Sequence, residues 1–215
     1  MRKIRHDLWA TEIEHPIPGL STRAYLWAGP RGNVLFYNTS QQSEIDELAE
    51  LGGVDRQYLS HRDEIGPSLR TIKQRFGSTL HITAAEAPVA EEICAVDGTF
   101  DRRQAEYGFE VIPTPGHTPG SACFLVPSSD GKKYLFTGDT IVRAAEGNWF
   151  AGYIPGHSDK DALTDTLEVL AELDPDVIVS SAVADGSGFT ELEDRTWSEC
   201  VREALTELAG SPSNT

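Results

Sequence analysis

The chain has 215 residues, of which 39% are hydrophobic and 24% are charged, a composition typical of a globular protein and unlike that of a disordered or fibrous chain. With 34 acidic and 18 basic residues the net charge is −16, and such a surface repels phosphate backbones and anionic membranes. We therefore expect neither nucleic acid nor a membrane as a partner.

The chain shows no sequence sign of export. No stretch approaches the roughly 18 apolar residues of a membrane helix, and the opening MRKIRHDLWATEIEHP lacks the apolar segment of a secretory signal. We expect a cytoplasmic location. Cys94, Cys123 and Cys200 lie far apart without a CxxC pair, which argues against a thiolate zinc site or a disulfide framework and predicts buried apolar side chains.

The first third of the chain predicts a hairpin followed by a strand–helix–strand unit. Apolar runs at 21–29 (STRAYLWAG) and 33–39 (NVLFYNT) flank the turn-forming GPRG. Helical spacing over 43–53 (SEIDELAELGG) follows, with Ser43 as the expected N-cap and two glycines as a stop. The strand RQYLSH then places His61 at a strand's C-terminal edge, where α/β proteins tend to gather ligands.

The rest of the chain continues to alternate strands and helices. Signals between 85 and 107 are weak and indicate a short helix, a turn at Asp97-Gly98 and an edge strand. The helix over 158–173 is expected to take Ser158 as its N-cap. We expect a single domain over 1–210, built from two related halves, and a frayed tail at 211–215. The other expected elements are a helix at 65–77, strands at 78–83, 109–113, 122–129, 132–138 and 174–181, and a closing helix at 191–210.

The segment TPGHTPGS, residues 114–121, places one histidine between two Pro-Gly corners. Proline restricts φ, and glycine supplies backbone conformations that other residues reach only with strain. A mobile loop needs neither, so we expect the imidazole of His117 to be held in a fixed position.

Four segments place side chains that could bind a metal at the ends of predicted strands. They are SHRDE, TPGHTPGS, FTGDT and IPGHSD, which carry His61, Asp63, His117, Asp139 and His157. Imidazole nitrogen and carboxylate oxygen suit zinc, iron or manganese. His61 and Asp63 lie two apart on a segment expected to be extended, so both side chains should point the same way.

The order of these segments resembles the metallo-β-lactamase-fold superfamily, particularly its glyoxalase II-like hydrolases. The resemblance spans residues 20–185, and PGHTPGS and the apolar segment ending in TGD are its most specific parts. It implies an α+β fold, a four-layer αββα sandwich with a metal centre at one edge of the sheets. It also implies hydrolysis of an ester, thioester, lactam or phosphoester.

The resemblance transfers only part of the family's metal site. His117 matches the histidine of the Pro-Gly-His segment, Asp139 matches the carboxylate that bridges two metals, and His61 matches the first histidine of the His-x-His-x-Asp-His signature. The later ligand positions fall on residues that do not match, namely Asp63, Ile65, Gly66 and the stretch from Ser180 to Ala182. The acidic residue that often ends the family's first core strands corresponds to Asn38. Two metals are therefore not expected.

The donors that remain predict one divalent metal ion held by His61, Asp63, His117 and Asp139, with zinc as the first choice and iron or manganese as alternatives. Asp139 would complete the shell or act as general base, which makes it the expected catalytic residue. Glu64 could replace either carboxylate, although its neighbouring position should point the other way.

Three interpretations stay open. The first is a mononuclear metal-dependent hydrolase acting on an ester- or thioester-like small molecule. The second is a metal-depleted pseudoenzyme that uses the fold for binding or assembly, and the third is an iron-dependent redox protein similar to the flavodiiron branch. His157 could substitute for the missing histidine. The aromatic residues Trp149, Phe150 and Tyr153 could wall a pocket or pack in the core.

Overall fold

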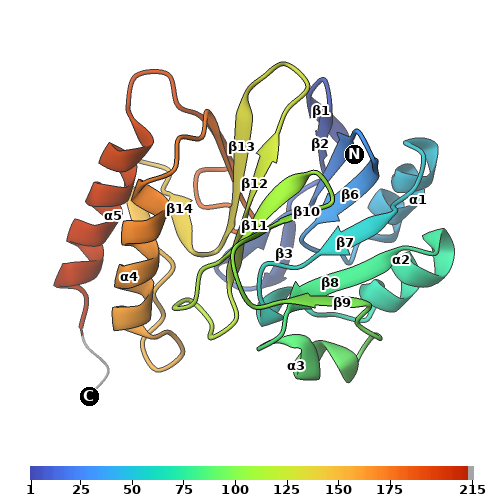
Figure 1. The fold of residues 1–215 in the computed structure, drawn as a ribbon, viewed down its shortest axis with the longest axis horizontal. Coiled ribbons are helices and arrows are strands. Elements are labelled where there is room, and N and C mark those ends of the chain that lie inside the picture. Colours follow the sequence, from blue (N-terminus) through green and yellow to red (C-terminus); the bar gives the residue numbers. More distant parts are fainter. Residues whose placement is uncertain (213–215) are drawn as a thin grey trace.

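Two β-sheets lie face to face in the computed structural model, which describes residues 1–212 (Figure 1). The first has the strand order β1-β2-β5-β6-β7-β8-β9 and the second β10-β11-β12-β13-β16-β17. The first comprises β1 (Arg2–Arg5), β2 (Leu8–Ala10), β5 (Tyr25–Gly29), β6 (Gly32–Phe36), β7 (Arg56–Tyr58), β8 (Thr79–Thr83) and β9 (Gly98–Phe100). The second comprises β10 (Gln104–Glu106), β11 (Phe109–Pro113), β12 (Ala122–Pro127), β13 (Lys133–Gly138), β16 (Val177–Ser180) and β17 (Phe189–Glu191).

Helices cover the outer faces of both sheets (Figure 1). The first sheet carries α1 (Gln42–Glu50), α2 (Ser68–Phe76) and α3 (Ala87–Glu91). The second carries α4 (Lys160–Ala171) and α5 (Trp197–Gly210). The sequence of layers is therefore helix, sheet, sheet, helix, which confirms the expected αββα sandwich.

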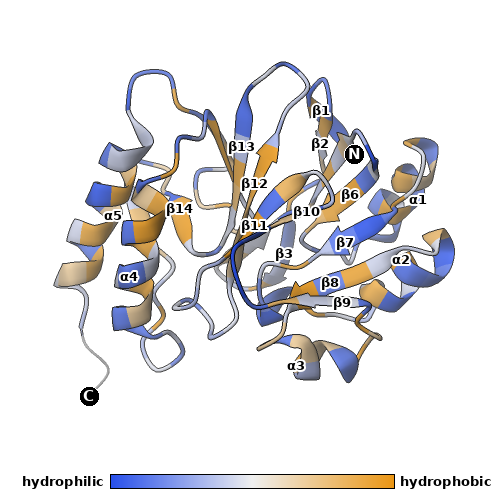
Figure 2. Cartoon of the chain, viewed as in Figure 1, coloured by the Kyte–Doolittle hydropathy of each residue, from blue (hydrophilic) through white to orange (hydrophobic). Residues whose placement is uncertain are grey.

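Aromatic side chains from both sheets form the central core. Phe36 of β6 stacks on Phe136 of β13 with ring centroids 4.1 Å apart, and Phe124 of β12 lies 5.1 Å from Phe36. Because side chains alternate along a strand, Leu135, the neighbour of Phe136, faces outward and packs in the cluster that contains Leu163 of α4. Figure 2 shows these strands as the hydrophobic interior between hydrophilic edges.

The C-terminal ends of β7, β11 and β13 lie at the same edge of the two sheets. β6, β7 and β8 run parallel to one another in the first sheet, and β13 runs parallel to β16 in the second. The backbone N–H of Ala122 in the second sheet donates to the carbonyl of Ser60, which follows β7 of the first (2.8 Å). The loop after β7 therefore lies beside the loop between β11 and β12, and the 3.6 Å between Nε2 of His61 and Oδ2 of Asp139 places the loop after β13 at the same edge.

Several local predictions are wrong in informative ways. α5 starts at Trp197 rather than 191, because Thr196 and Glu199 form a reciprocal capping box there. Glu191, where the helix was expected to begin, is the last residue of β17. Asp159, not Ser158, caps α4, and its carboxylate accepts from two backbone N–H groups. α1 begins one residue before Ser43, which makes no cap.

Several short strands were not predicted from the sequence, among them the β1–β2 hairpin, β17 and two hairpins near the candidate site. These two hairpins are β3 (Glu14–Ile17) with β4 (Leu20–Thr22), and β14 (Ile141–Arg143) with β15 (Trp149–Ala151). Each strand has three or four residues, too few to establish an alternating pattern. Both hairpins contribute walls of the cavities described below.

The cysteines match the expectation, since Cys94, Cys123 and Cys200 are all free and buried. Within the part of the chain that the structure describes, no helix has the length and apolarity to cross a membrane. Of the expected frayed tail, residues 213–215 lie outside the described residues.

Candidate metal centre

His61 and Asp63 come from a tight turn rather than from an extended segment. His61 itself is extended (φ −165°, ψ 174°), but Arg62–Glu64 form one turn of 3-10 helix. The alternation on which their common direction was predicted is therefore absent. The turn nevertheless brings Oδ2 of Asp63 to 3.8 Å from Nε2 of His61.

His117 lies in the loop between β11 and β12, which packs on the start of α4. Gly116 has φ +139°, and a Cβ there would lie 2.4 Å from Cα of Leu163. The backbone N–H of Asp159 donates to the carbonyl of Gly116 (2.8 Å), and the hydroxyl of Ser158 donates to the carbonyl of His117 (3.0 Å). The Pro-Gly corners thus permit a close approach between loop and helix that fixes the backbone around the imidazole.

Asp139 follows β13 and is oriented from one side only. Its Oδ1 accepts hydrogen bonds from the hydroxyl of Ser181 and from the backbone N–H of Ala182 (3.0 Å). These residues follow β16, where the family's last histidine was sought. They supply no imidazole, but they hold Asp139 so that Oδ2 is left to face the two histidines.

The four expected residues meet in one cluster. Oδ2 of Asp139 lies 3.6 Å from Nε2 of His61 and 3.9 Å from Nε2 of His117. Oδ2 of Asp63 lies 3.6 Å from Nε2 of His117. A metal ion with four ligands at about 2.1 Å in tetrahedral geometry has ligand atoms about 3.4 Å apart. The printed distances are close to this value, but Asp63 and Asp139 belong to separate groups of mutually close ligand atoms. One ion bound by all four residues therefore requires Asp63 and Asp139 to move closer together.

Hydrogen bonds on the far side of each ring fix which nitrogen faces the cluster. Nδ1 of His117 donates to the carbonyl of Gly152 (2.6 Å). Nδ1 of His61 contacts the hydroxyl of Ser60 (2.8 Å), whose own proton is directed to Glu64 (2.6 Å), so the ring is the donor. Both Nε2 atoms are buried and have no hydrogen-bond partner among the described residues.

The electrostatics of the cluster favour a cation between these groups. Burial lowers the pKa of His61, but Asp139, Glu64 and Asp63 outweigh it and raise that pKa to about 9. Burial raises the pKa of Asp139, yet the two histidines and the Ser181 hydroxyl hold it well below its usual range. Burial also raises the pKa of Glu64 to about 7. The field that retains a proton on His61 would equally attract a metal ion.

His157, the candidate substitute, also reaches the cluster. Its Nε2 lies 3.5 Å from Oδ2 of Asp63, and its ring centroid lies 5.8 Å from that of His117. Its side chain is 38% exposed, so it borders solvent. The described residues contain two groups able to hold a metal, His61 with His117 and Asp139, and Asp63 with His117 and His157. Both include His117, which joins them into one cluster.

The other residues that the sequence singled out near the site have different roles in the structure. Glu64 accepts from the backbone N–H of Ser60 (2.7 Å) as well as from its hydroxyl, so it supports the turn and does not replace a ligand. Phe150 and Tyr153 line a cavity beside the cluster, which is the first of the two roles expected for these aromatic residues. Trp149 instead packs edge-on against Trp197 in the core (5.7 Å).

Sequence reasoning missed the groups that orient the ligands. Ser60, Gly152, Ser181 and Ala182 act through a hydroxyl or the backbone, and such groups have no motif of their own. Asn38, at the position where an acidic residue was sought, donates to the carbonyl of Glu64 (2.9 Å) and so braces the turn. Among the residues around the cluster that lie outside the four expected ligands, only His157 had a sequence signal, the repeated Pro-Gly-His triplet.

Comparison with known proteins agrees with this architecture. Residues 57–182 match the metallo-beta-lactamase superfamily. A hydroxyacylglutathione hydrolase of Rhizobium meliloti is 34% identical over 93 residues, which are 43% of this chain and 35% of that protein. A second, from Photorhabdus laumondii, is 27% identical over 172 residues, 77% of this chain and 64% of that protein. The matches thus span from about a third to two thirds of these relatives' length.

Solved structures show the same fold at low sequence identity. A metallo-beta-lactamase from Pontibacter korlensis superposes with a TM-score of 0.73 at 17% identity, and the superposition covers 98% of both chains.

Proposed function

The chain belongs to the metallo-beta-lactamase superfamily, and from that premise we propose that it is a hydrolase with one divalent metal ion that cleaves an ester or thioester bond of a small molecule. Zinc is the first choice of metal, and iron and manganese suit the same donors. The hydroxyacylglutathione hydrolases among its relatives support the ester and thioester class.

One observation carries the proposal. Two buried imidazole nitrogens face two carboxylate oxygens and have no hydrogen-bond partner among the described residues. Leaving a buried polar atom unsatisfied costs about 1–3 kcal/mol. A metal ion bound to both nitrogens would remove this cost. A pseudoenzyme that had lost its metal would gain nothing by keeping this arrangement, which is why we favour the hydrolase.

We assign His61, His117, Asp63 and Asp139 as the residues that would hold the metal. A divalent ion held there would polarise the scissile carbonyl and lower the pKa of a water molecule. Gly152 and Ser60 keep the two rings in the tautomer that offers Nε2.

Asp139 suits the role of ligand better than that of general base. Its pKa is held well below the usual range by the histidines and by Ser181, and a carboxylate that binds protons so weakly is a poor proton acceptor near neutral pH. His157 borders both solvent and Asp63. Because imidazole is the group most often used for proton transfer, we assign His157 to carry protons between the site and solvent.

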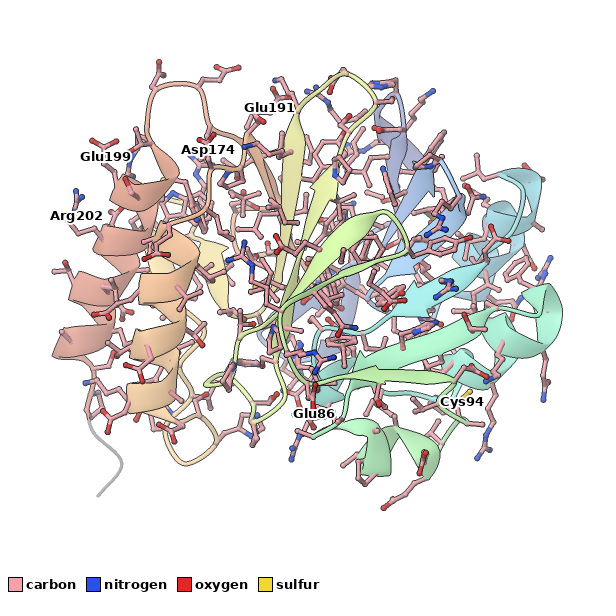
Figure 3. The ribbon with its side chains drawn as sticks, viewed as in Figure 1. Glu86, Cys94, Asp174, Glu191, Glu199 and Arg202 are labelled. Carbon is pink, nitrogen blue, oxygen red and sulfur yellow. The ribbon has the colours of Figure 1, made fainter. Side chains whose placement is uncertain are left out.

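The test compares two aspartates. In protein loaded with zinc, Asp139→Ala should reduce hydrolysis of ester and thioester substrates by at least a thousandfold. Asp174→Ala is the matched control, because that carboxylate is 97% exposed and lies beside the start of β13, the strand whose other end carries Asp139 (Figure 3). Equal activity in Asp139→Ala and in the parent protein would contradict the proposal. No activity in the metal-loaded parent on either substrate class would favour the pseudoenzyme.

A further inference from the structure

A cavity beside the metal cluster limits which substrates the site can accept. We propose that this cavity binds the acyl group of the substrate and that this group is apolar, uncharged and about six to ten carbon atoms long. The inference rests on the proposed function, since it names the substrate class of that hydrolase.

The cavity connects an apolar wall to the expected ligands. It has a volume of about 310 Å³, and both His117 and Asp139 line it. Its apolar lining comes from four separate segments and consists chiefly of Leu20, Val142, Phe150, Ile154 and Val183. A group bound there therefore lies directly beside the atoms that would hold the metal.

The segments that form the wall also orient the ligands. Gly152, whose carbonyl fixes His117, lies between Phe150 and Ile154 in the chain. Ala182, whose N–H fixes Asp139, directly precedes Val183. The distance between the acyl wall and the reactive centre is thus set by short lengths of backbone, which suits a site that must place a carbonyl accurately.

The charges around the cavity exclude an anionic acyl group. Its charged lining residues are Asp139 and Glu207, and no lysine or arginine lines it within residues 1–212. A carboxylate at the far end of the acyl group would be repelled by Glu207, because Asp139 is neutralised by the metal that it is proposed to hold. A second cavity of about 210 Å³ lies on the other side of the cluster, and it is lined by Arg23, Asp63 and several polar residues. Arg23 is a cationic residue that the first cavity lacks, so an uncharged acyl group suits the first cavity and the second is left for the leaving group.

The volume gives the chain length. At roughly 30 Å³ for each heavy atom, the share that a water molecule takes in the liquid, the first cavity holds roughly ten atoms. Each methylene removed from water contributes about 0.8 kcal/mol, which corresponds to about fourfold in kcat/KM. The increase should stop once the cavity is full.

The first test is an acyl series. For p-nitrophenyl esters with two to twelve carbons, kcat/KM of the zinc-loaded protein should rise about fourfold per methylene and level off between six and ten. A p-nitrophenyl monoester of glutaric acid, which ends in a carboxylate, should react at least tenfold more slowly than the hexanoyl ester. A flat series, or a preference for the anionic ester, would overturn the inference and leave the hydrolase proposal standing.

Two matched variants locate the binding site. Ile154 lines the cavity and is 48% exposed, whereas Val169 is 45% exposed on α4 and does not line it. Ile154→Arg should lower kcat/KM for the octanoyl ester at least tenfold and raise it for the glutaryl ester. Val169→Arg should leave both unchanged. Equal effects of the two substitutions would contradict the assignment of this cavity.

Binding of octanamide, an uncharged ligand without a scissile ester bond, separates the two proposals. Calorimetry should show that octanamide binds the parent and Val169→Arg but binds Ile154→Arg at least tenfold more weakly. That pattern without hydrolysis of any ester would uphold the cavity as an apolar site and refute the hydrolase. Hydrolysis with a flat acyl series and no binding of octanamide would do the reverse.

Discussion

Glu86 links the two loops that carry the histidines. It is fully buried, and one carboxylate oxygen accepts from the hydroxyl of Thr118 and from the backbone N–H of Gly120, both at 2.8 Å. The other oxygen accepts from the guanidinium of Arg62, which stands between His61 and Asp63 in the chain. Figure 3 shows Glu86 at the edge where these loops meet. We infer that it positions the ligands without touching the metal.

Glu86→Gln should weaken zinc binding by about ten- to a hundredfold, the usual effect of losing a group that orients a ligand. Glutamine retains the size and can still accept from Gly120, but its amide nitrogen cannot accept from Arg62. Zinc affinity is measured by competition with a chelator, and thermal unfolding of the metal-free variant is measured alongside. A lower melting temperature with unchanged zinc affinity would show that Glu86 stabilises only the fold.

At the same scale, the sequence predicted the residues that bear a strong chemical signal. His61, Asp63, His117 and Asp139 follow strands and do lie together. The hydrogen bonds that aim them could not be predicted, because the carbonyl of Gly152 or the N–H of Ala182 depends on where distant loops pass. His157 was found from its motif, but only the fold shows that its loop returns to Asp63.

At the scale of elements, the loop 114–121 and α4 form one unit. The hydroxyl of Thr166, on the second turn of α4, donates to the carbonyl of Pro115 (2.7 Å), in addition to the contacts of Gly116 with the helix start. The helix therefore supports the loop that carries His117. The cap at Asp159 rather than Ser158 matters here, because the Ser158 hydroxyl donates to the carbonyl of His117 instead of capping the helix.

Gly116→Ala should destabilise the fold by about 3 kcal/mol or more and weaken zinc binding, because the new Cβ would lie 2.4 Å from backbone of Leu163 at a positive φ. Gly156→Ala is the control: it has φ +79° with open space around it, so only the cost of the backbone conformation, about 1–2 kcal/mol, is expected. Urea unfolding measures both. A Gly116→Ala variant no less stable than Gly156→Ala would contradict the close packing of loop and helix.

Long, periodic elements were predictable and short ones were not. The amphipathic helices and the apolar strands of the central sheets appear where their patterns indicated. The β3–β4 and β14–β15 hairpins were not predicted, because strands of three or four residues are too short to show a periodic pattern. The predicted start of the closing helix was too early, because a capping residue does not belong to the periodic pattern of its helix. These hairpins provide much of the cavity wall, so the proposed substrate site was the part of the molecule that the sequence predicted least well.

At the scale of the whole molecule, the candidate metal ligands come from both sheets. His61 and Asp63 follow β7 in the first sheet, whereas His117 and Asp139 follow β11 and β13 in the second. The aromatic core between the sheets, centred on the stacked Phe36 and Phe136, holds these loops at one edge. A metal that binds only this assembled site stabilises the folded state, so its presence reports the whole architecture.

The most direct measurement is the metal content of the protein purified without added metal, together with His61→Ala, His117→Ala and the control His6→Ala, whose side chain is exposed. Elemental analysis should find about one equivalent of zinc, iron or manganese in the parent and in His6→Ala, and less than a tenth of that in the other two. Parent protein that contains no metal, even after loading, or that retains two equivalents, would contradict the single metal centre.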